Sequence, residues 1–165
     1  IEHLLSETLG AERILWLNHG YLAGDDTDSH IDTLARFCAP DHICYVSCSN
    51  VSDEHYSALA AMEEELQQFH QADGRPYRLT PLPWPDAIHD DDGERLPATY
   101  ANFLVINGAV LVPVYGVPQD EEAVATLSNL FPDREVIPVN CRALITQGGS
   151  LHCITMQIPA GVVGA

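Results

Sequence analysis

Phe103-Leu104-Val105-Ile106-Asn107-Gly108-Ala109-Val110-Leu111-Val112-Pro113-Val114 is the longest apolar stretch of the chain. The pair Asn107-Gly108 divides it, and such a pair is typical of the two-residue turn of a β-hairpin. Pro113 interrupts the stretch again near its end. The stretch is therefore too short and too broken for a membrane span, which needs about 20 apolar residues in a row. It predicts two strands that pair around a tight turn within residues 103–112.

Helical and strand patterns lie on both sides of this hairpin. Downstream, we predict a helix over 120–130 and a strand over 135–139. Upstream, we predict a strand over 43–47, a helix capped by Ser52 or Asp53, and a strand over 77–82. The inner faces of the two helices carry apolar residues at three- and four-residue steps: Leu59, Met62, Leu66 and Phe69 in the first, Val124, Leu127 and Phe131 in the second. The sequence thus predicts an α/β protein with two similar units, and neither unit has enough strands to close a sheet alone.

Shorter patterns mark the N-terminal part of the chain. Residues 1–9 have a helical pattern, and Ile14-Leu15-Trp16-Leu17 predicts a short buried strand. A polar loop over 18–29 follows. A short helix is predicted over 31–37, with Ile31, Leu34 and Ala35 on one face, before Pro40-Asp41 turns the chain. Polar loops next to buried strands often carry chemistry, so the loop over 18–29 is a candidate site.

The charge of the chain restricts its partners. It has 24 acidic and seven basic residues, which give a net charge of −17. This charge repels nucleic acid and anionic membrane surfaces and favours a cationic ligand. The apolar share of 46% and the charged share of 19% are ordinary for a globular protein. We therefore expect a cytoplasmic protein with no nucleic-acid or membrane partner.

The five cysteines do not form a recognisable framework. Their number is odd, and they include no CxxC pair and no zinc-knuckle spacing. Cys38, Cys44 and Cys48 stand among apolar residues, so we expect small buried hydrophobic side chains in a reducing compartment. Cys153 differs, because the paired glycines Gly148 and Gly149 precede it and allow a close approach of backbone and ligand.

Cys153 alone is better explained as a structural thiol than as a nucleophile. A cysteine nucleophile needs a proton carrier, and histidine is the side chain best suited to that role near neutral pH. His152 is adjacent, but in an extended segment it would point away from Cys153. His30, in the loop Gly24-Asp25-Asp26-Thr27-Asp28-Ser29-His30-Ile31-Asp32, is the better candidate and changes the balance.

The same loop has two other interpretations. The alternating oxygen ligands resemble a calcium loop, but the sixth position is not glycine and Phe37 occupies the twelfth, where a glutamate belongs. A zinc or iron site built from His30, Asp32 and a distant histidine remains open. So does a solvated turn in which Asp28 or Ser29 caps the helix predicted at Ile31.

Taken together and in order, these segments resemble the agmatine deiminase and bacterial peptidyl-arginine deiminase family. The resemblance rests on residues 14–17, 24–32, 100–103 with Asn107-Gly108 and Val112-Pro113, 131–136 and 148–155. It implies a pentein fold, a pseudo-fivefold α/β propeller of ββαβ sectors. Residues 1–165 would be the C-terminal portion of a single catalytic domain, about two to three sectors, with an N-terminal half absent. The family's Trp-x-Arg-Asp segment has no match in this chain.

The resemblance also implies a reaction: hydrolysis of a guanidine group to a ureido product and ammonia through a covalent cysteine intermediate. Cys153 would be the nucleophile and His30 the acid and base, while Asp32, Gly148 and Gly149 would bind substrate. No metal and no cofactor are implied. The partners would be a small cationic guanidine substrate, the missing N-terminal half and a possible second copy in a homo-oligomer. A metal-dependent hydrolase and an inactive fragment or binding module are the alternatives.

One departure from the family lies beside the nucleophile. Gln147-Gly148-Gly149-Ser150 stands where three glycines and an asparagine are common, so the shape of this loop is expected to differ.

Overall fold

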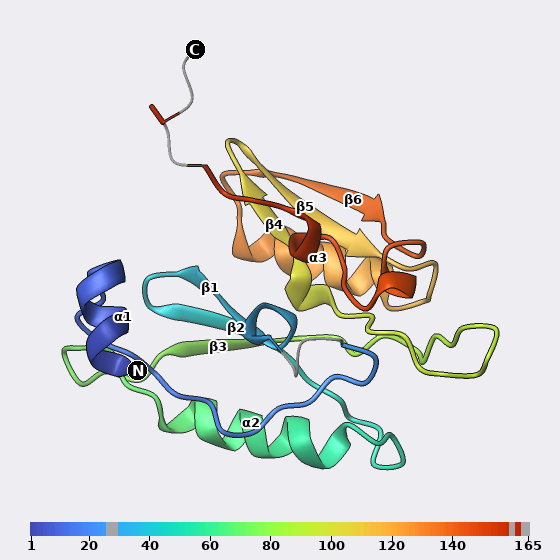
Figure 1. Ribbon diagram of the computed structural model, residues 1–165, viewed down its shortest axis with the longest axis horizontal. Helices are drawn as coiled ribbons and strands as arrows, with labels where there is room; N and C mark the ends of the chain where they lie inside the picture. Colours follow the sequence, from blue (N-terminus) through green and yellow to red (C-terminus); the bar gives the residue numbers. More distant parts are fainter. Residues whose placement is uncertain (26–29, 159–160, 163–165) are drawn as a thin grey trace.

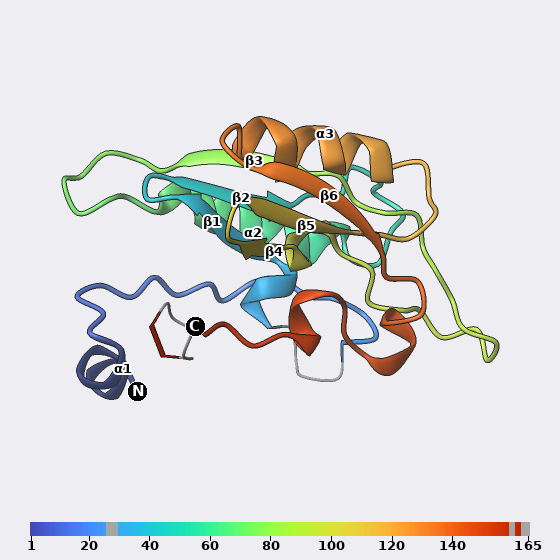
Figure 2. The ribbon, with the colours of Figure 1, turned by 90° about the horizontal axis from the view of Figure 1, so that it is seen from above.

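The computed structural model describes residues 1–25, 30–158 and 161–162, and two similar units follow one another in it (Figure 1). The first unit contains β1 (Ala35–Ala39), β2 (His42–Val46), α2 (Tyr56–Gln68) and β3 (Arg78–Leu82). The second contains β4 (Leu104–Ile106), β5 (Ala109–Val114), α3 (Asp120–Leu130) and β6 (Glu135–Asn140). Helix α1 (Glu2–Leu9) has no buried residue and lies apart from both sheets (Figure 2). The repeated strand, helix and strand pattern is confirmed.

Both sheets have the same topology. Each has three strands, in the orders β1-β2-β3 and β4-β5-β6. The first two strands of each sheet are an antiparallel hairpin, and the third runs parallel to the second. A parallel neighbour needs a crossover, which α2 and α3 provide. The predicted hairpin within 103–112 is confirmed, with Ile106 opposite Ala109 across the Asn107-Gly108 turn.

The two helices pack through the residues that their periodicity indicated. Leu59, Met62 and Leu66 of α2 are buried, and so is Leu127 of α3. The predicted cap of α2 is wrong, because the helix begins at Tyr56 and no side chain caps it. Asp53 lies three residues before the helix, where its carboxylate accepts the amide of His55 and binds Arg95 through two hydrogen bonds of 3.0 and 2.9 Å.

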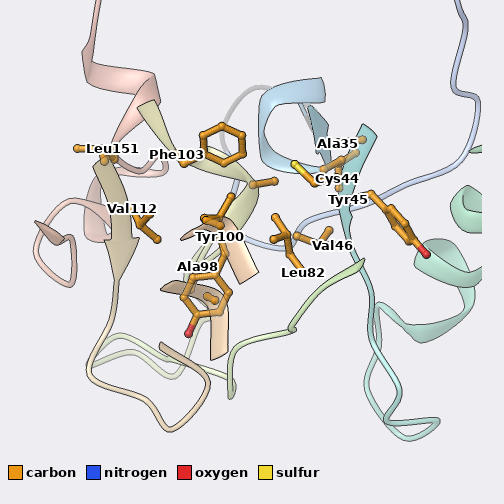
Figure 3. Close-up of a cluster of buried hydrophobic side chains, with 14 of the residues drawn as sticks. Ala35, Cys44, Tyr45, Val46, Leu82, Ala98, Tyr100, Phe103, Val112 and Leu151 are labelled. Carbon is orange, nitrogen blue, oxygen red and sulfur yellow. The ribbon is translucent and has the colours of Figure 1, made fainter. Parts of the chain in front are cut away.

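A single core joins the two units. Val46 and Leu82 of the first unit and Phe103 and Val112 of the second belong to one cluster of buried side chains (Figure 3). Polar contacts cross the same boundary. Arg36 donates a hydrogen bond of 3.0 Å to the Phe103 carbonyl and lies over the Phe103 ring. The units therefore form one body and not two domains.

Two predicted elements are wrong. Residues 14–17 form no strand, and Trp16 is 48% exposed. The backbone after them turns to α2, because the amides of Asn18 and His19 donate to the Glu65 carboxylate instead of to a neighbouring strand.

The helix predicted over 31–37 is also wrong. A single 3-10 turn, η1 (Ile31–Thr33), leads directly into β1, and Ile31 is exposed while Leu34 and Ala35 are buried. Pairing with β2, which places Arg36 opposite Cys44, outweighs the helical spacing of three apolar residues.

The cysteines are mostly as predicted. Cys44 and Cys48 are buried, Cys38 is only half-buried, and all five thiols are free. Among the described helices, none has the length and apolar character needed to cross a membrane.

Candidate active site

Three short turns bring the candidate residues together. They are η1, η2 (Tyr100–Asn102) and η4 (His152–Ile154). Figure 2 shows η1, in light blue, next to η4, in red. Since η1 belongs to the first unit and the other two turns flank the second, the site lies where the units meet.

Asp32 is the centre of this arrangement. Its Oδ2 accepts one hydrogen bond of 2.7 Å from Nδ1 of His152 and another of 3.1 Å from Nδ2 of Asn102. Its Oδ1 lies 3.9 Å from Nδ1 of His30. The side chain is 19% exposed, so the carboxylate is only partly open to solvent, and its two described donors both bind Oδ2.

Asn102 connects Asp32 to the segment of Cys153, the candidate nucleophile. Its side chain is fully buried, and its Oδ1 accepts a hydrogen bond of 2.8 Å from the backbone amide of His152. The same oxygen lies 3.5 Å from Sγ of Cys153, where the thiol can donate to it. One amide therefore contacts both of the groups that guanidine hydrolysis would require.

The backbone before Cys153 is shaped by the two glycines. Gly148 has a φ of 77°, in the left-handed region that glycine favours, and ends the 3-10 turn η3 (Ile145–Gln147). A Cβ on Gly149 would lie 3.0 Å from Cβ of Cys153 and 3.4 Å from its Sγ. Ser150 fixes the next position, because its hydroxyl is buried and 2.8 Å from the Tyr115 hydroxyl. Cys153 itself is exposed.

His30 stands at the edge of the site. Its side chain is 62% exposed, and its backbone amide donates to Asp25. Nδ1 of its ring lies 3.9 Å from Oδ1 of Asp32. Among the described contacts, the ring makes no hydrogen bond with Cys153. Asp26, Asp28 and Ser29, which had candidate roles in the sequence, lie outside the described residues.

His152 and Asn102 were missed or misjudged from the sequence. We expected His152 to point away, but η4 is a 3-10 turn and not an extended segment, so the ring reaches Asp32. The glycines before Cys153 were a signal that this segment is not extended. Asn102 lies in the segment 100–103 that carried part of the resemblance, but its role depends on contacts with residues 50 and 70 positions away.

A half-buried arginine, Arg36, lies near the carboxylate of this site. Burial lowers the pKa of Arg36, and the negative charge of Asp32 partly opposes that shift. As for metals, no group of three or more histidine, cysteine, aspartate or glutamate side chains could hold an ion within the described part of the chain. One reaction that these residue types can perform is the attack of a thiol on a cation held by a carboxylate.

The chain is similar to known proteins over nearly its whole length. Residues 1–159 match the family model of Porphyromonas-type peptidyl-arginine deiminase. Agmatine deiminase of Stutzerimonas stutzeri is 34% identical over 180 residues, which cover 99% of this chain and 49% of that protein. The chain spans about half the length of the curated relatives that it matches.

Solved structures agree as well. One from Porphyromonas gingivalis, provisionally assigned as an arginine deiminase, is 58% identical with a TM-score of 0.94 and covers 97% of this chain and 47% of that one. The structure of C. jejuni agmatine deiminase is 41% identical with a TM-score of 0.83 and covers 92% of this chain and 44% of that one. The chain therefore has the α/β fold of these deiminases and belongs to the Porphyromonas-type peptidyl-arginine deiminase family.

Proposed function

We propose that residues 1–165 are the C-terminal portion of a guanidine hydrolase that converts an agmatine- or arginine-type substrate to a ureido product and ammonia. One observation carries the proposal: the Asp32 carboxylate and the Cys153 thiol both contact the buried amide of Asn102. A carboxylate and a nucleophile held by one rigid group can act on the same small ligand. The family match and the net charge of −17 also favour a cationic guanidine substrate.

In the proposed reaction, the substrate guanidinium binds first. It is a planar cation, and Oδ1 of Asp32 would accept a charge-assisted hydrogen bond from it. Gly148 and Gly149 leave room for the ligand beside the thiol. Because a bound guanidinium has a fixed plane, its central carbon would be presented to Sγ of Cys153.

The chemical steps then need only the nucleophile and one proton carrier. Sulfur of Cys153 bonds to the central carbon, a C–N bond breaks, and His30 protonates the departing nitrogen, which leaves as ammonia. Water attacks the resulting amidino-thioether after His30 takes its proton. The C–S bond breaks, which releases the ureido product and returns the thiolate. No metal or organic cofactor takes part in these steps.

The missing part of the site is proposed to lie in an N-terminal half of the same polypeptide. The two ββαβ units would be sectors of a pseudo-fivefold propeller, and the other half would supply further carboxylates for the guanidinium. The support for this is that relatives are about twice as long as this chain. Agmatine is the favoured substrate, because several relatives are named agmatine deiminases. Five free thiols suit a reducing, cytoplasmic environment.

The proposal is tested by replacing the reacting residues in the full-length protein. Cys153→Ala and His30→Ala should each lower ureido-product formation by at least about a thousandfold, as expected when a nucleophile or its proton partner is lost. The measurement is release of ammonia from agmatine and from peptidyl arginine.

Cys38→Ala and His89→Ala serve as matched controls, because Cys38 is a half-buried thiol of β1 and His89 lies in the loop after β3. Near-normal turnover by Cys153→Ala would refute the proposal. Turnover that survives thiol alkylation but disappears on exhaustive chelation would instead support the metal-dependent hydrolase.

A further inference from the structure

We propose that Asn102 is a positioning residue for this reaction: it holds the substrate carboxylate and the nucleophile segment in one fixed arrangement. The inference rests on the proposed function and extends it to a residue outside the reacting groups. It assigns Oδ1 of Asp32, and not Oδ2, as the oxygen that receives the guanidinium. It also makes the amide of Asn102 the link between the two units of the fold.

The orientation of the Asn102 amide follows from its partners. Its Oδ1 faces the backbone N–H of His152, which can only donate, at 2.8 Å. Its Nδ2 faces the Asp32 carboxylate at 3.1 Å and the Asp32 carbonyl at 3.4 Å, which can only accept. The reverse orientation would place donor against donor and acceptor against acceptor. Only an amide can satisfy both sides at this buried position.

The local backbone supports this placement. Asn102 is the last residue of η2, and Thr99 caps that turn by accepting the amide of Ala101. Thr99 also donates a hydrogen bond of 2.6 Å to the carbonyl of Thr33, the residue after Asp32. Thr33, Thr99 and Asn102 are buried, and hydrogen bonds join η1 to η2 at Thr33 and at Asp32. A shift of Asn102 would therefore also shift Asp32.

The substrate oxygen follows from the hydrogen bonds that are already made. Two donors, Nδ2 of Asn102 and Nδ1 of His152, converge on Oδ2 of Asp32. Among the described residues, the polar neighbour of Oδ1 is the exposed ring of His30, at 3.9 Å. A guanidinium would therefore bind Oδ1, which the two donors leave unused, beside His30.

Asn102→Asp tests this role with almost no change of shape. The new carboxylate would face Oδ2 of Asp32. Two carboxylates at this distance repel each other when both are ionised, and they share a proton when one is not. At high pH the pair repels and Asp32 is displaced. At low pH the shared proton replaces the lost N–H donor. The ratio of the variant's kcat/KM to that of the wild type should therefore rise as the pH falls.

The titratable and charged groups around this pair are His30, His152, Cys153 and Arg36. All four are present in both proteins and lie near the new charge of Asn102→Asp, so the ratio is read together with the double variant described below. We expect a loss of about a hundredfold at pH 8, the cost of a misplacement of about 1 Å, and a recovery of at least about tenfold by pH 5.5. A purely structural defect would give a ratio that does not change with pH.

Asn140→Asp is the matched control. Asn140 ends β6, and its Oδ1 accepts the amide of Arg142, a bond that a carboxylate can keep. Its ratio to the wild type should stay within about twofold at every pH. Should Asn102→Asp fold poorly, the exchange Asp32→Asn with Asn102→Asp restores a donor opposite an acceptor. That double variant should regain the melting temperature of the wild type but no turnover.

The outcomes separate this inference from the proposed function. An active wild type with a pH-independent ratio for Asn102→Asp overturns the role of Asn102 alone, and so does a double variant that is no more stable than Asn102→Asp. A wild type that releases no ammonia from any guanidine substrate overturns both. A ratio that rises toward low pH, with a flat control, supports the positioning role.

Discussion

Gly149 sets the space that is left for Cys153, the proposed nucleophile. Its backbone is in a conformation that other residues adopt, but an added Cβ would lie 3.0 Å from Cβ of Cys153. Gly149→Ala should therefore displace the thiol and lower kcat by about tenfold to a hundredfold, with little change in melting temperature. Steady-state kinetics and thermal unfolding measure the two effects.

Gly93→Ala is the opposite control. Gly93 has open space around it but a φ of 87°, so alanine there costs about 1 kcal/mol of backbone strain and should leave turnover unchanged. Equal turnover by Gly149→Ala and the wild type would show that the thiol does not need this space.

His55 links the stability of the fold to pH. The side chain is fully buried, its Nε2 accepts the amide of Ala23 at 2.9 Å, and its Nδ1 donates to Asp53 at 2.8 Å. Burial lowers the pKa of His55, although the hydrogen bond to Asp53 acts in the opposite direction. Burial alone would raise the pKa of Asp53, but hydrogen bonds from Arg95 and His55 outweigh it and hold that pKa well below its usual range.

Both shifts predict that the protein loses stability in acid. The unfolded chain binds a proton at His55 near pH 6.5, where the folded protein still resists it, so unfolding is favoured as the pH falls below about 6.5. Asp53 adds to this loss below about pH 4. The melting temperature should therefore fall between pH 7 and 5, and less steeply in His55→Gln. Equal slopes in the two proteins would contradict the role of His55.

Single residues also show best how much of the candidate site could be predicted from the sequence. Cys153, His30 and Asp32 could be proposed because the segments that contain them resemble one family. Asn102 and His152 stand in segments of the same resemblance, but their contacts exist only once the two units pack. Their partners are 50 to 120 positions away in sequence.

At the level of elements, α3 depends on its first residue. The Asp120 carboxylate accepts the backbone amides of Tyr115, Gly116 and Val117 and the hydroxyl of Tyr100. Asp120→Ala would leave these donors without their acceptor and should lower the free energy of unfolding by about 2 kcal/mol. Denaturant unfolding measures it.

Glu121→Ala is the matched control, since Glu121 is an exposed acid in the same first turn. Its effect should stay within about 0.5 kcal/mol. A similar loss in both variants would mean that Asp120 acts through the helix dipole and not through its hydrogen bonds.

The elements that were predicted correctly are those with a strong local signal. The Asn107-Gly108 turn predicted the hairpin β4-β5, and the apolar stripe predicted α3. Residues 14–17 and 31–37 are short segments with few apolar residues and a weaker signal. Their structure depends on contacts with α2 and β2, which spacing along the chain does not contain.

On the scale of the whole molecule, the shared core makes the two units one body, but the proposed site still needs an N-terminal half. We predict that residues 1–165 alone release no ammonia from agmatine, and that co-expression with the preceding half of the polypeptide restores release. A mixture with the Cys153→Ala chain should stay inactive. Full turnover by the chain alone would contradict the proposed division of the site.

The contact between Asp32 and His152 has a consequence for the order of folding, because it joins positions 120 residues apart. Closing so long a loop costs entropy before any contact repays it, which makes such contacts late. During synthesis, the segment with Asp32 leaves the ribosome long before Cys153 does. The thiol therefore meets its carboxylate only after β6 has been made, and no shorter nascent chain contains an assembled site.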